Sequence, residues 1–167
     1  MIGIVDYNAG NIKSVERSLV ALGIDYKISK NPTDLSDVDR VIFPGVGEAA
    51  FAMDQLQKSG FDSFLKDFAA SGKPLLGICL GSQVIFDYSE EGDTQCLGLV
   101  KGSVKHFASV LPESEKDLKI PHMGWSSVDF VKNLPIFDGI PNHSDFYFVH
   151  SYLIQPETRA VVAGYAD

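Results

Sequence analysis

The sequence predicts an α/β fold in which helices flank a mostly parallel β-sheet, followed by a β-rich extension. Over roughly the first half of the chain, short apolar runs alternate with segments of helical periodicity, which is the order of a parallel sheet with crossover helices. Glycines stand where several of these segments end, as helix C-termini and tight turns require. After Gly92 the apolar runs become short and β-like and are separated by proline and glycine.

The strands and helices expected in the first part follow one another in the order of crossover units. Strands are predicted at residues 2–5, 24–28, 40–43 and 74–78. Helices are predicted at residues 12–22, 49–58, 62–71 and 80 to about 88. In the second part, β-like runs are predicted at residues 102–107, 127–131, 145–152 and 160–164. Because the chain shows no internal repeat and no linker, we expect a single domain over residues 1–167.

Composition argues against several classes of function. A chain of 167 residues with 45% hydrophobic residues is long enough to bury a core without metals or disulfides. Its formal net charge of -8 disfavours binding to phosphate backbones and to anionic membranes. The apolar runs are far shorter than the ~18 residues of a spanning helix, and the N-terminal stretch has no secretory pattern. We therefore expect a soluble cytoplasmic protein with no metal, cofactor, nucleic-acid or membrane partner.

The strongest chemical signal is the run GICLGSQ at residues 77–83, where Cys79 stands between a strand and a helix with no loop. A residue in such a turn must adopt a strained backbone, and small residues two positions before and after it, here Gly77 and Gly81, relieve the crowding. The turn holds the sulfur at the carboxyl edge of the sheet and at a helix N-terminus, which favours a thiolate. The sequence therefore predicts Cys79 as a nucleophile, with a small buried cysteine as the alternative.

A second glycine-rich turn, PGVG at residues 44–47, follows another parallel strand and should reach the same edge of the sheet. Its glycines allow backbone N–H groups to point inward, as an oxyanion hole requires when a thiolate attacks a carbonyl. The N–H of Leu80, directly after the nucleophile, is the natural second donor. Gln83 lies one helical turn beyond Cys79, so its amide could face a substrate. An ordinary turn and a solvated helix residue are the alternatives.

Together these motifs resemble the class I (triad) glutamine amidotransferases. Five further stretches narrow the resemblance to the glutaminase subunits of imidazole glycerol phosphate synthase, and they extend it over essentially the whole chain: residues 4–11, 89–92, 97–99, 121–125 and 147–152. The resemblance implies a flavodoxin-like fold. It also implies that Cys79 attacks the side-chain amide of glutamine, forming a glutamyl thioester and releasing ammonia.

The resemblance implies a role for each of three groups of residues. The oxyanion donors would be backbone N–H groups at Gly47 and Leu80. Glutamine would be held by Gln83, Glu91, Ser151 and Tyr152. Residues expected to lie toward a cyclase subunit of (βα)₈-barrel fold, into which ammonia is channelled, are Asn8, Asn11, Met123 and Trp125. Enclosed transfer is physically reasonable because ammonia that escapes into water at neutral pH is protonated and is no longer a nucleophile.

The catalytic base is the main departure from the family pattern. The family's triad is completed by a downstream His-Pro-Glu stretch, and none of the four histidines of this sequence stands in such a motif. We therefore expect the chain to be a truncated form with negligible glutamine turnover by itself. A noncatalytic partner-binding form, and use of His150 as the base, are the alternatives.

The pathway is also left open by the sequence. The same motifs fit a paralogous amidotransferase subunit that acts on a surface-sugar precursor, and only the identity of the partner separates the two. Glu48 and Ser126 stand where the family more often has a small residue and an asparagine. Glu48 directly follows the PGVG turn, and Ser126 directly follows Trp125, which is expected to face the partner.

Overall fold

The computed structural model describes residues 1–166, which fall into two compact units, Met1–Lys101 and a second unit that begins at Gly102. The prediction of a single domain over the whole chain stays a prediction. No helix within residues 1–166 is long and apolar enough to cross a membrane.

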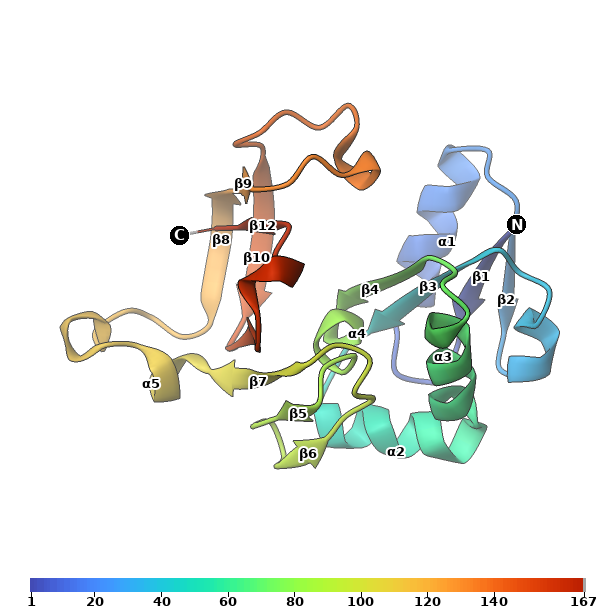
Figure 1. Ribbon diagram of the computed structural model, residues 1–167, viewed down its shortest axis with the longest axis horizontal. Helices are drawn as coiled ribbons and strands as arrows, with labels where there is room; N and C mark the ends of the chain where they lie inside the picture. The colour runs from blue at the N-terminus through green and yellow to red at the C-terminus, as the bar shows by residue number, and fades with distance from the viewer. Residues whose placement is uncertain (167) are drawn as a thin grey trace. The chain divides into compact units, whose positions relative to one another are not determined.

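The first unit is built on a parallel sheet of four strands in the order β2-β1-β3-β4. The strands are β1 (Ile2–Val5), β2 (Tyr26–Ser29), β3 (Arg40–Gly45) and β4 (Leu75–Cys79). The helices between them are α1 (Ile12–Ala21), the 3-10 turn η1 (Pro32–Leu35), α2 (Ala49–Ser59) and α3 (Phe61–Ala70). Figure 1 shows the sheet between α1 and the pair α2 and α3. The predicted α/β fold with a parallel sheet is confirmed.

Local chemistry explains where these helices begin and end. The Asn11 side chain accepts a hydrogen bond from the N–H of Ser14 and so caps the first turn of α1. Between α2 and α3 the chain reverses at Gly60, whose φ of 76° lies in the left-handed region that glycine adopts without penalty. These caps place the helix boundaries within two residues of the predicted ones.

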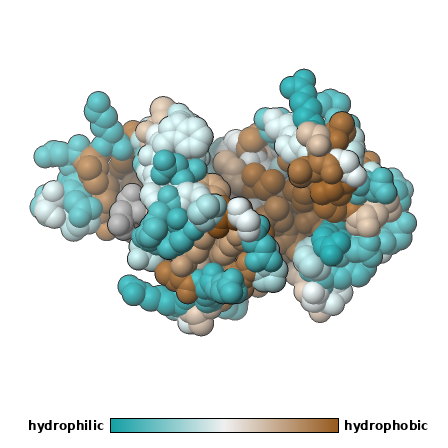
Figure 2. Space-filling view, turned by 90° about the horizontal axis from the view of Figure 1, so that it is seen from above, coloured by the Kyte–Doolittle hydropathy of each residue, from teal (hydrophilic) through white to brown (hydrophobic). Residues whose placement is uncertain are grey.

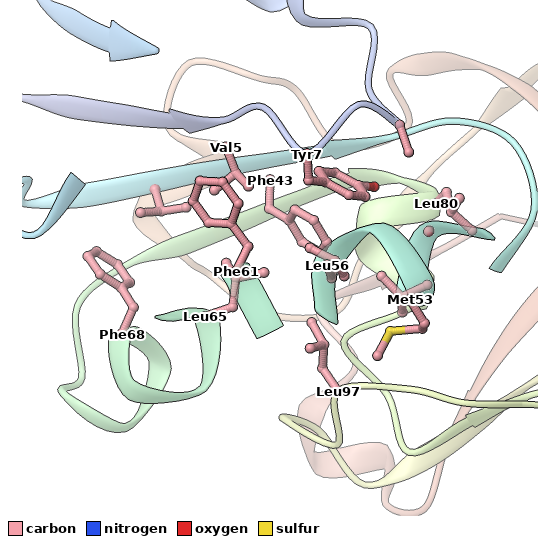
Figure 3. Packing of buried hydrophobic residues seen from close by; sticks show 14 of the residues in the cluster. Val5, Tyr7, Phe43, Met53, Leu56, Phe61, Leu65, Phe68, Leu80 and Leu97 are labelled. Atoms are coloured by element: carbon pink, nitrogen blue, oxygen red, sulfur yellow. The ribbon is translucent and has the colours of Figure 1, made fainter. Parts of the chain in front are cut away.

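The sheet has two faces because successive strand residues point to opposite sides. One face packs on α2 and α3, with Val5, Phe43, Leu56, Phe61 and Leu65 fully buried (Figure 3). The other face packs on α1 through a smaller cluster, in which Ile4, Leu19 and Ile42 are the buried members.

The face toward α1 is only partly covered within the described residues. Leu76 and Ile78 alternate along the edge strand β4 and are 41% and 39% exposed. Val20 and Leu22, at the end of α1, are more exposed still. Figure 2 shows the corresponding hydrophobic surface gathered on the first unit.

The helix after Cys79 is much shorter than predicted. We expected it to run from residue 80 to about 88, whereas α4 spans only Leu80–Gln83. The carbonyl groups of Val84, Ile85, Phe86 and Asp87 accept hydrogen bonds from the amides of residues 96–100. If the helix continued, each of those carbonyls would accept a hydrogen bond from the N–H group four residues later in the chain. Here they accept from residues 96–100 instead, so this tertiary pairing ends the helix. The chain continues into the antiparallel pair β5 (Tyr88–Ser89) and β6 (Thr94–Gln95).

The second unit consists of antiparallel pairs, as expected for the β-rich extension. These are β7 (Gly102–His106) with β11 (Tyr152–Pro156), β8 (His122–Ser127) with β10 (Asp145–His150), and β9 (Asp129–Phe130) with β12 (Gly164–Tyr165). Short helical turns connect them: α5 (Phe107–Val110), η2 (Glu113–Glu115), η3 (Pro135–Phe137) and η4 (Arg159–Val161).

Three boundaries in this unit were predicted wrongly. The run at 127–131 was expected as one strand, but the longer strand β8 precedes it, because β8 pairs along its whole length with β10. The run at 145–152 is two strands that part at Ser151, whose carbonyl accepts the N–H of Phe107 instead of continuing a ladder. The run at 160–164 is mostly outside any strand, since η4 takes its first two residues.

The passage from β4 to α4 depends on two glycines. A Cβ on Gly77 would lie 2.8 Å from the carbonyl oxygen of Gly81, and a Cβ on Gly81 would overlap the carbonyl oxygen of Phe43 in β3. Both obstacles are backbone atoms, which cannot rotate away as a flexible side chain would. The glycines predicted from the sequence to relieve crowding therefore do so here.

Gly81→Ala should destabilise the first unit by at least about 3 kcal/mol, because the new methyl group forces β3 and α4 apart. Chemical denaturation followed by circular dichroism measures the change. Gly23→Ala is the matched control: its φ is 64° and nothing lies within 4 Å of the added Cβ, so it should cost only about 1–2 kcal/mol of backbone strain. Equal losses in the two variants would contradict the packing argument.

Candidate active site

Cys79 is the last residue of β4 and the residue that precedes α4. Its φ and ψ are 56° and -121°, a backbone conformation that residues other than glycine rarely adopt. The side chain is exposed, and the Cys79 carbonyl accepts a hydrogen bond of 2.6 Å from the hydroxyl of Ser82. The predicted strained turn with an accessible sulfur is therefore present.

The PGVG turn reaches the same edge of the sheet as Cys79. Strands β3 and β4 are parallel, and Gly45 is the register partner of Cys79. The N–H of Val46 donates to the carbonyl of Ala9 at 2.8 Å, which holds the turn against the end of β1. Beyond it, Gly47 has a φ of 93° and is exposed.

Two amides beside the nucleophile match what an oxyanion hole needs. Within residues 1–166 the N–H of Gly47 donates no hydrogen bond. Leu80 is the first residue of α4, so its N–H has no partner inside the helix. Their role as oxyanion donors stays a prediction.

Glu91 is tied to the start of α2, just beyond the PGVG turn. Its Oε2 accepts a hydrogen bond of 2.9 Å from the N–H of Ala49, whereas the preceding residue, Glu48, makes no capping bond with its side chain. A carboxylate at this position is favourable because helix N-termini carry partial positive charge. Glu91 thereby links the loop after β5 to the segment that carries Gly47.

The environment of Glu91 raises the pKa of its carboxyl group. Burial is the main cause, and the negative charge of Glu48 acts in the same direction, while the hydrogen bond from Ala49 opposes both. The neighbourhood therefore disfavours the negative charge on Glu91. A cation placed beside it, such as the ammonium group of an amino acid, would offset that penalty.

The remaining predicted residues of the first unit have simpler surroundings. Gln83 is half-buried and ends α4, one turn beyond Cys79. Asn8 is exposed, with a positive φ of 68°, and its Oδ1 accepts from Lys30 at 2.7 Å. Asn11 caps α1. Both asparagines thus have a local structural role beside any contact with a partner.

Met123 and Trp125 lie on the second unit, where they are 61% and 70% exposed. They alternate along β8 and therefore share one face of the strand. Directly opposite on β10 are Val149 and Tyr147, both 55% exposed. The rings of Trp125 and Tyr147 meet edge to face, with their centres 5.5 Å apart. We call these four side chains the exposed ribbon.

Tyr147 and Val149 are members of this surface that were not predicted from the sequence. Their alternation with Phe146 and Phe148 was a usable signal, but an isolated strand does not reveal which of its faces is covered. An exposed apolar and aromatic surface of this kind marks interaction sites in soluble proteins.

Ser151 and Tyr152 also belong to the second unit, at the junction of β10 and β11. The ring of Tyr152 meets His106 edge to face, with their centres 5.0 Å apart. His150, beside them, donates from Nδ1 to the carbonyl of Tyr152 at 2.7 Å, since a carbonyl can only accept. Its Nε2 is buried and makes no hydrogen bond within the described part of the chain.

All the histidines of the sequence follow residue 105, so the unit that carries Cys79 has none. Among residues 1–166, no group of three or more histidine, cysteine, aspartate or glutamate side chains is arranged to hold a metal ion.

Cys96 contrasts with Cys79. It is partly buried, and burial raises the pKa of its thiol to about 11, with the negative charge of Glu91 adding to the effect. At neutral pH this thiol keeps its proton, and a protonated thiol is a poor nucleophile.

Comparison with known proteins decides the family. A family model described as glutamine amidotransferase class-I matches residues 3–166. The chain belongs to this family. A relative named imidazole glycerol phosphate synthase subunit HisH, from Dehalococcoides mccartyi, is 46% identical over 168 residues, which span 100% of this chain and 78% of the relative. A relative of the same name from Nitratidesulfovibrio vulgaris is 44% identical, spanning 98% of this chain and 77% of the relative.

Solved structures agree with the amidotransferase fold. A crystal structure of a glutamine amidotransferase matches with a TM-score of 0.73 at 16% identity, covering 98% of this chain and 78% of the other. The structure of PurLQS from Thermotoga maritima matches with a TM-score of 0.68 at 17% identity, covering 99% of this chain and 73% of the other. At these identities the likeness supports the fold alone.

Glu91→Gln should change how stability depends on pH. The folded-state pKa of Glu91 lies above its unfolded value. Protonation of Glu91 therefore contributes to the free energy of unfolding, fully at pH values below the unfolded pKa, and this contribution is lost as the pH rises through the folded pKa. Glutamine keeps an acceptor for Ala49 but does not titrate. As the pH is lowered from about 7 to about 4, the free energy of unfolding of the wild type should therefore increase relative to that of Glu91→Gln, as urea unfolding measures.

Glu157→Gln, at an exposed position of the second unit, controls for the loss of one negative charge. A difference in free energy of unfolding between the wild type and Glu91→Gln that shrinks as the pH falls would contradict the prediction. The same pH dependence in Glu157→Gln would also contradict it.

Proposed function

We propose that this protein is a glutaminase subunit of imidazole glycerol phosphate synthase, hydrolysing glutamine to glutamate and ammonia in histidine biosynthesis. The observation that carries the proposal is the strained, accessible Cys79 at the carboxyl edge of a parallel sheet, with the PGVG turn beside it. The HisH relatives match this chain along nearly all of its length, which supports the same activity here.

In the proposed reaction, the Cys79 sulfur attacks Cδ of the glutamine side chain. The carbonyl oxygen gains negative charge and is stabilised by the backbone N–H groups of Gly47 and Leu80. The C–N bond then breaks, the amide nitrogen takes up a proton, and ammonia leaves behind a glutamyl thioester. Water attacks the thioester carbon, releasing glutamate and restoring the thiol. The cycle requires a base that accepts the thiol proton and delivers a proton to the leaving nitrogen.

The amino-acid end of glutamine would be held by Gln83, Glu91, Ser151 and Tyr152. Glu91 is the best supported of these, because its partly buried carboxylate gains most from a cation at its free oxygen. Since its other oxygen holds the N–H of Ala49, substrate binding at Glu91 would also fix the start of α2 and the segment carrying Gly47. Binding and oxyanion stabilisation would then be mechanically linked.

Ammonia produced at Cys79 would be passed to a cyclase subunit of (βα)₈-barrel fold. We propose Asn8, Asn11, Met123 and Trp125 as residues that lie toward this partner. The exposed ribbon supports the proposal for the second unit, because two large aromatic rings and two aliphatic side chains stand together in solvent. Aromatic residues of this kind are frequent anchors of protein interfaces.

In a form of the protein that carries the family's histidine base, and in complex with the cyclase, Cys79→Ala should abolish glutamine hydrolysis and lower kcat by at least about a thousandfold, because the thioester can no longer form. Ammonia release in a coupled glutamate assay measures it. Cys96→Ala is the matched control and should retain most of the activity, since its thiol keeps its proton at neutral pH. Comparable activity of Cys79→Ala and the wild type would refute the assignment of the nucleophile.

Trp125→Ala should weaken binding of the cyclase subunit by about tenfold or more, because it removes the largest side chain of the exposed ribbon. Isothermal titration calorimetry gives the Kd. Leu118→Ala is the control, since Leu118 is similarly exposed on the same unit but lies outside the ribbon. An unchanged Kd for Trp125→Ala would exclude the ribbon from the interface.

A further inference from the structure

His150, the last residue of β10, has a half-buried ring on the side of the strand opposite the exposed ribbon. The ring lies among three other aromatic side chains, with distances between ring centres of 5.2 Å to Phe107, 5.4 Å to His122 and 5.7 Å to Phe148. These neighbours come from α5, β8 and β10. Packing from three elements therefore holds the imidazole in one orientation.

The chain bends directly after His150, where it leaves one antiparallel pair and enters another. Ser151 belongs to neither strand, and its carbonyl accepts the N–H of Phe107 at 3.0 Å. In an antiparallel ladder, this bond makes the next register pair, Tyr152 and His106, one whose backbone groups do not bond each other. The carbonyl of Tyr152 therefore points away from β7.

His150 supplies the hydrogen-bond partner of that outward carbonyl. Its Nδ1 donates to the carbonyl oxygen of Tyr152 at 2.7 Å, at the short end of the normal range. The bond spans Ser151 and fixes the peptide unit that follows Tyr152, while the bond from Phe107 fixes the unit that precedes it. Both peptide units on either side of Tyr152 are thus held.

The second ring nitrogen shows why histidine is suited to this position. With the proton on Nδ1, Nε2 carries a lone pair, and it is buried with no hydrogen bond within the described part of the chain. Burying an acceptor in this way lowers stability. Phenylalanine would fill the same aromatic surroundings without that loss, but it could not donate to Tyr152. Donation from Nδ1 is therefore what histidine adds here.

We propose that His150 is a positioning residue for the substrate, whose Nδ1–H group holds residues 151 and 152 in the conformation that binds the amino-acid end of glutamine. The proposal rests on the proposed function, in which Ser151 and Tyr152 hold that end. His150 itself does not touch glutamine and moves no proton in the reaction. It acts through the backbone of Tyr152, so its removal weakens binding and leaves the reactivity of Cys79 unchanged.

An affinity label tests the proposal without catalytic turnover. The label is the chloromethyl ketone analogue of glutamine, in which a chloromethyl group replaces the amide nitrogen. The Cys79 thiolate attacks the chloromethyl carbon, so that a C–S bond forms as the C–Cl bond breaks and chloride leaves with the bonding electrons. Because no leaving group has to be protonated, the 167-residue chain serves as it is.

The rate of labelling as a function of label concentration gives two constants. KI reports binding of the amino-acid end, and kinact reports alkylation once the label is bound. Peptide mass spectrometry separates Cys79 from Cys96. Glutamine added as a competitor shows that labelling occurs at the substrate site.

His150→Phe keeps the aromatic packing and removes the donor. It should raise KI by about three- to tenfold, the usual value of one hydrogen bond, and leave kinact within about twofold. Its urea unfolding midpoint should change little, because the bond to Tyr152 and the buried lone pair of Nε2 are lost together.

His150→Asn is the rescue variant. The Nδ2 of asparagine is as many bonds from the backbone as the Nδ1 of histidine, so it can donate to Tyr152, whereas the ring contacts are lost. KI should therefore stay within about twofold of the wild-type value although the urea midpoint falls. A purely structural role of His150 would make KI follow stability, which is the opposite order.

His122→Phe is the matched control. The ring of His122 stacks on Phe148 in the same cluster, but its Nε2 pairs with the hydroxyl of Ser126 at 3.1 Å. This variant should leave both KI and kinact unchanged.

An unchanged KI in His150→Phe overturns the proposal, and so does an equal rise in His150→Asn or His122→Phe. A lower kinact with unchanged KI would place His150 in the chemistry at Cys79 and would also overturn it. Each of these outcomes leaves the glutaminase assignment intact, provided that wild-type Cys79 is labelled saturably and glutamine competes. Without saturable, competed labelling in the wild type, the proposed function fails, and the positioning role fails with it.

Discussion

The candidate active site depends on one crowded backbone crossing, where β3, β4 and α4 approach so closely that no side chain fits. Gly81 lies against the carbonyl of Phe43, and Gly77 lies against the carbonyl of Gly81. This contact leaves no room for a loop between β4 and α4. The direct turn in turn forces Cys79 into its positive φ and exposes its sulfur. Packing and reactivity thus have a common cause.

Around this crossing, two polar side chains lie in surroundings that do not fully satisfy them. The Tyr7 hydroxyl is buried and has no hydrogen-bond partner among residues 1–166, and Glu91 carries its charge in a partly buried position beside Glu48. The negative charge of Glu91 is unfavourable in these surroundings and becomes favourable when a cation binds beside it. The hydrogen bond from Ala49 to Glu91 joins substrate recognition to the segment that carries Gly47.

Within the first unit, the sequence predicted the strands and most helix ends well, because apolar periodicity and glycine caps are local signals. It overestimated α4 because the carbonyls after Gln83 pair with residues 96–100, a contact that no local pattern encodes. It misplaced strands of the second unit for a similar reason. Of the exposed ribbon, Met123 and Trp125 were expected from the family resemblance, whereas Tyr147 and Val149 are recognised only from the pairing of β10 with β8.

By itself, the sequence determined the elements of the chemistry: a cysteine between glycines at the end of a strand, a second glycine turn, and an acidic composition that disfavours nucleic acid. These are residue types at fixed spacing, and spacing along one strand or turn survives folding. Only the tertiary structure decided which groups surround them. The family resemblance named Glu91, but its burial and its hydrogen bond with Ala49 join residues far apart in the sequence and could not be deduced from local sequence.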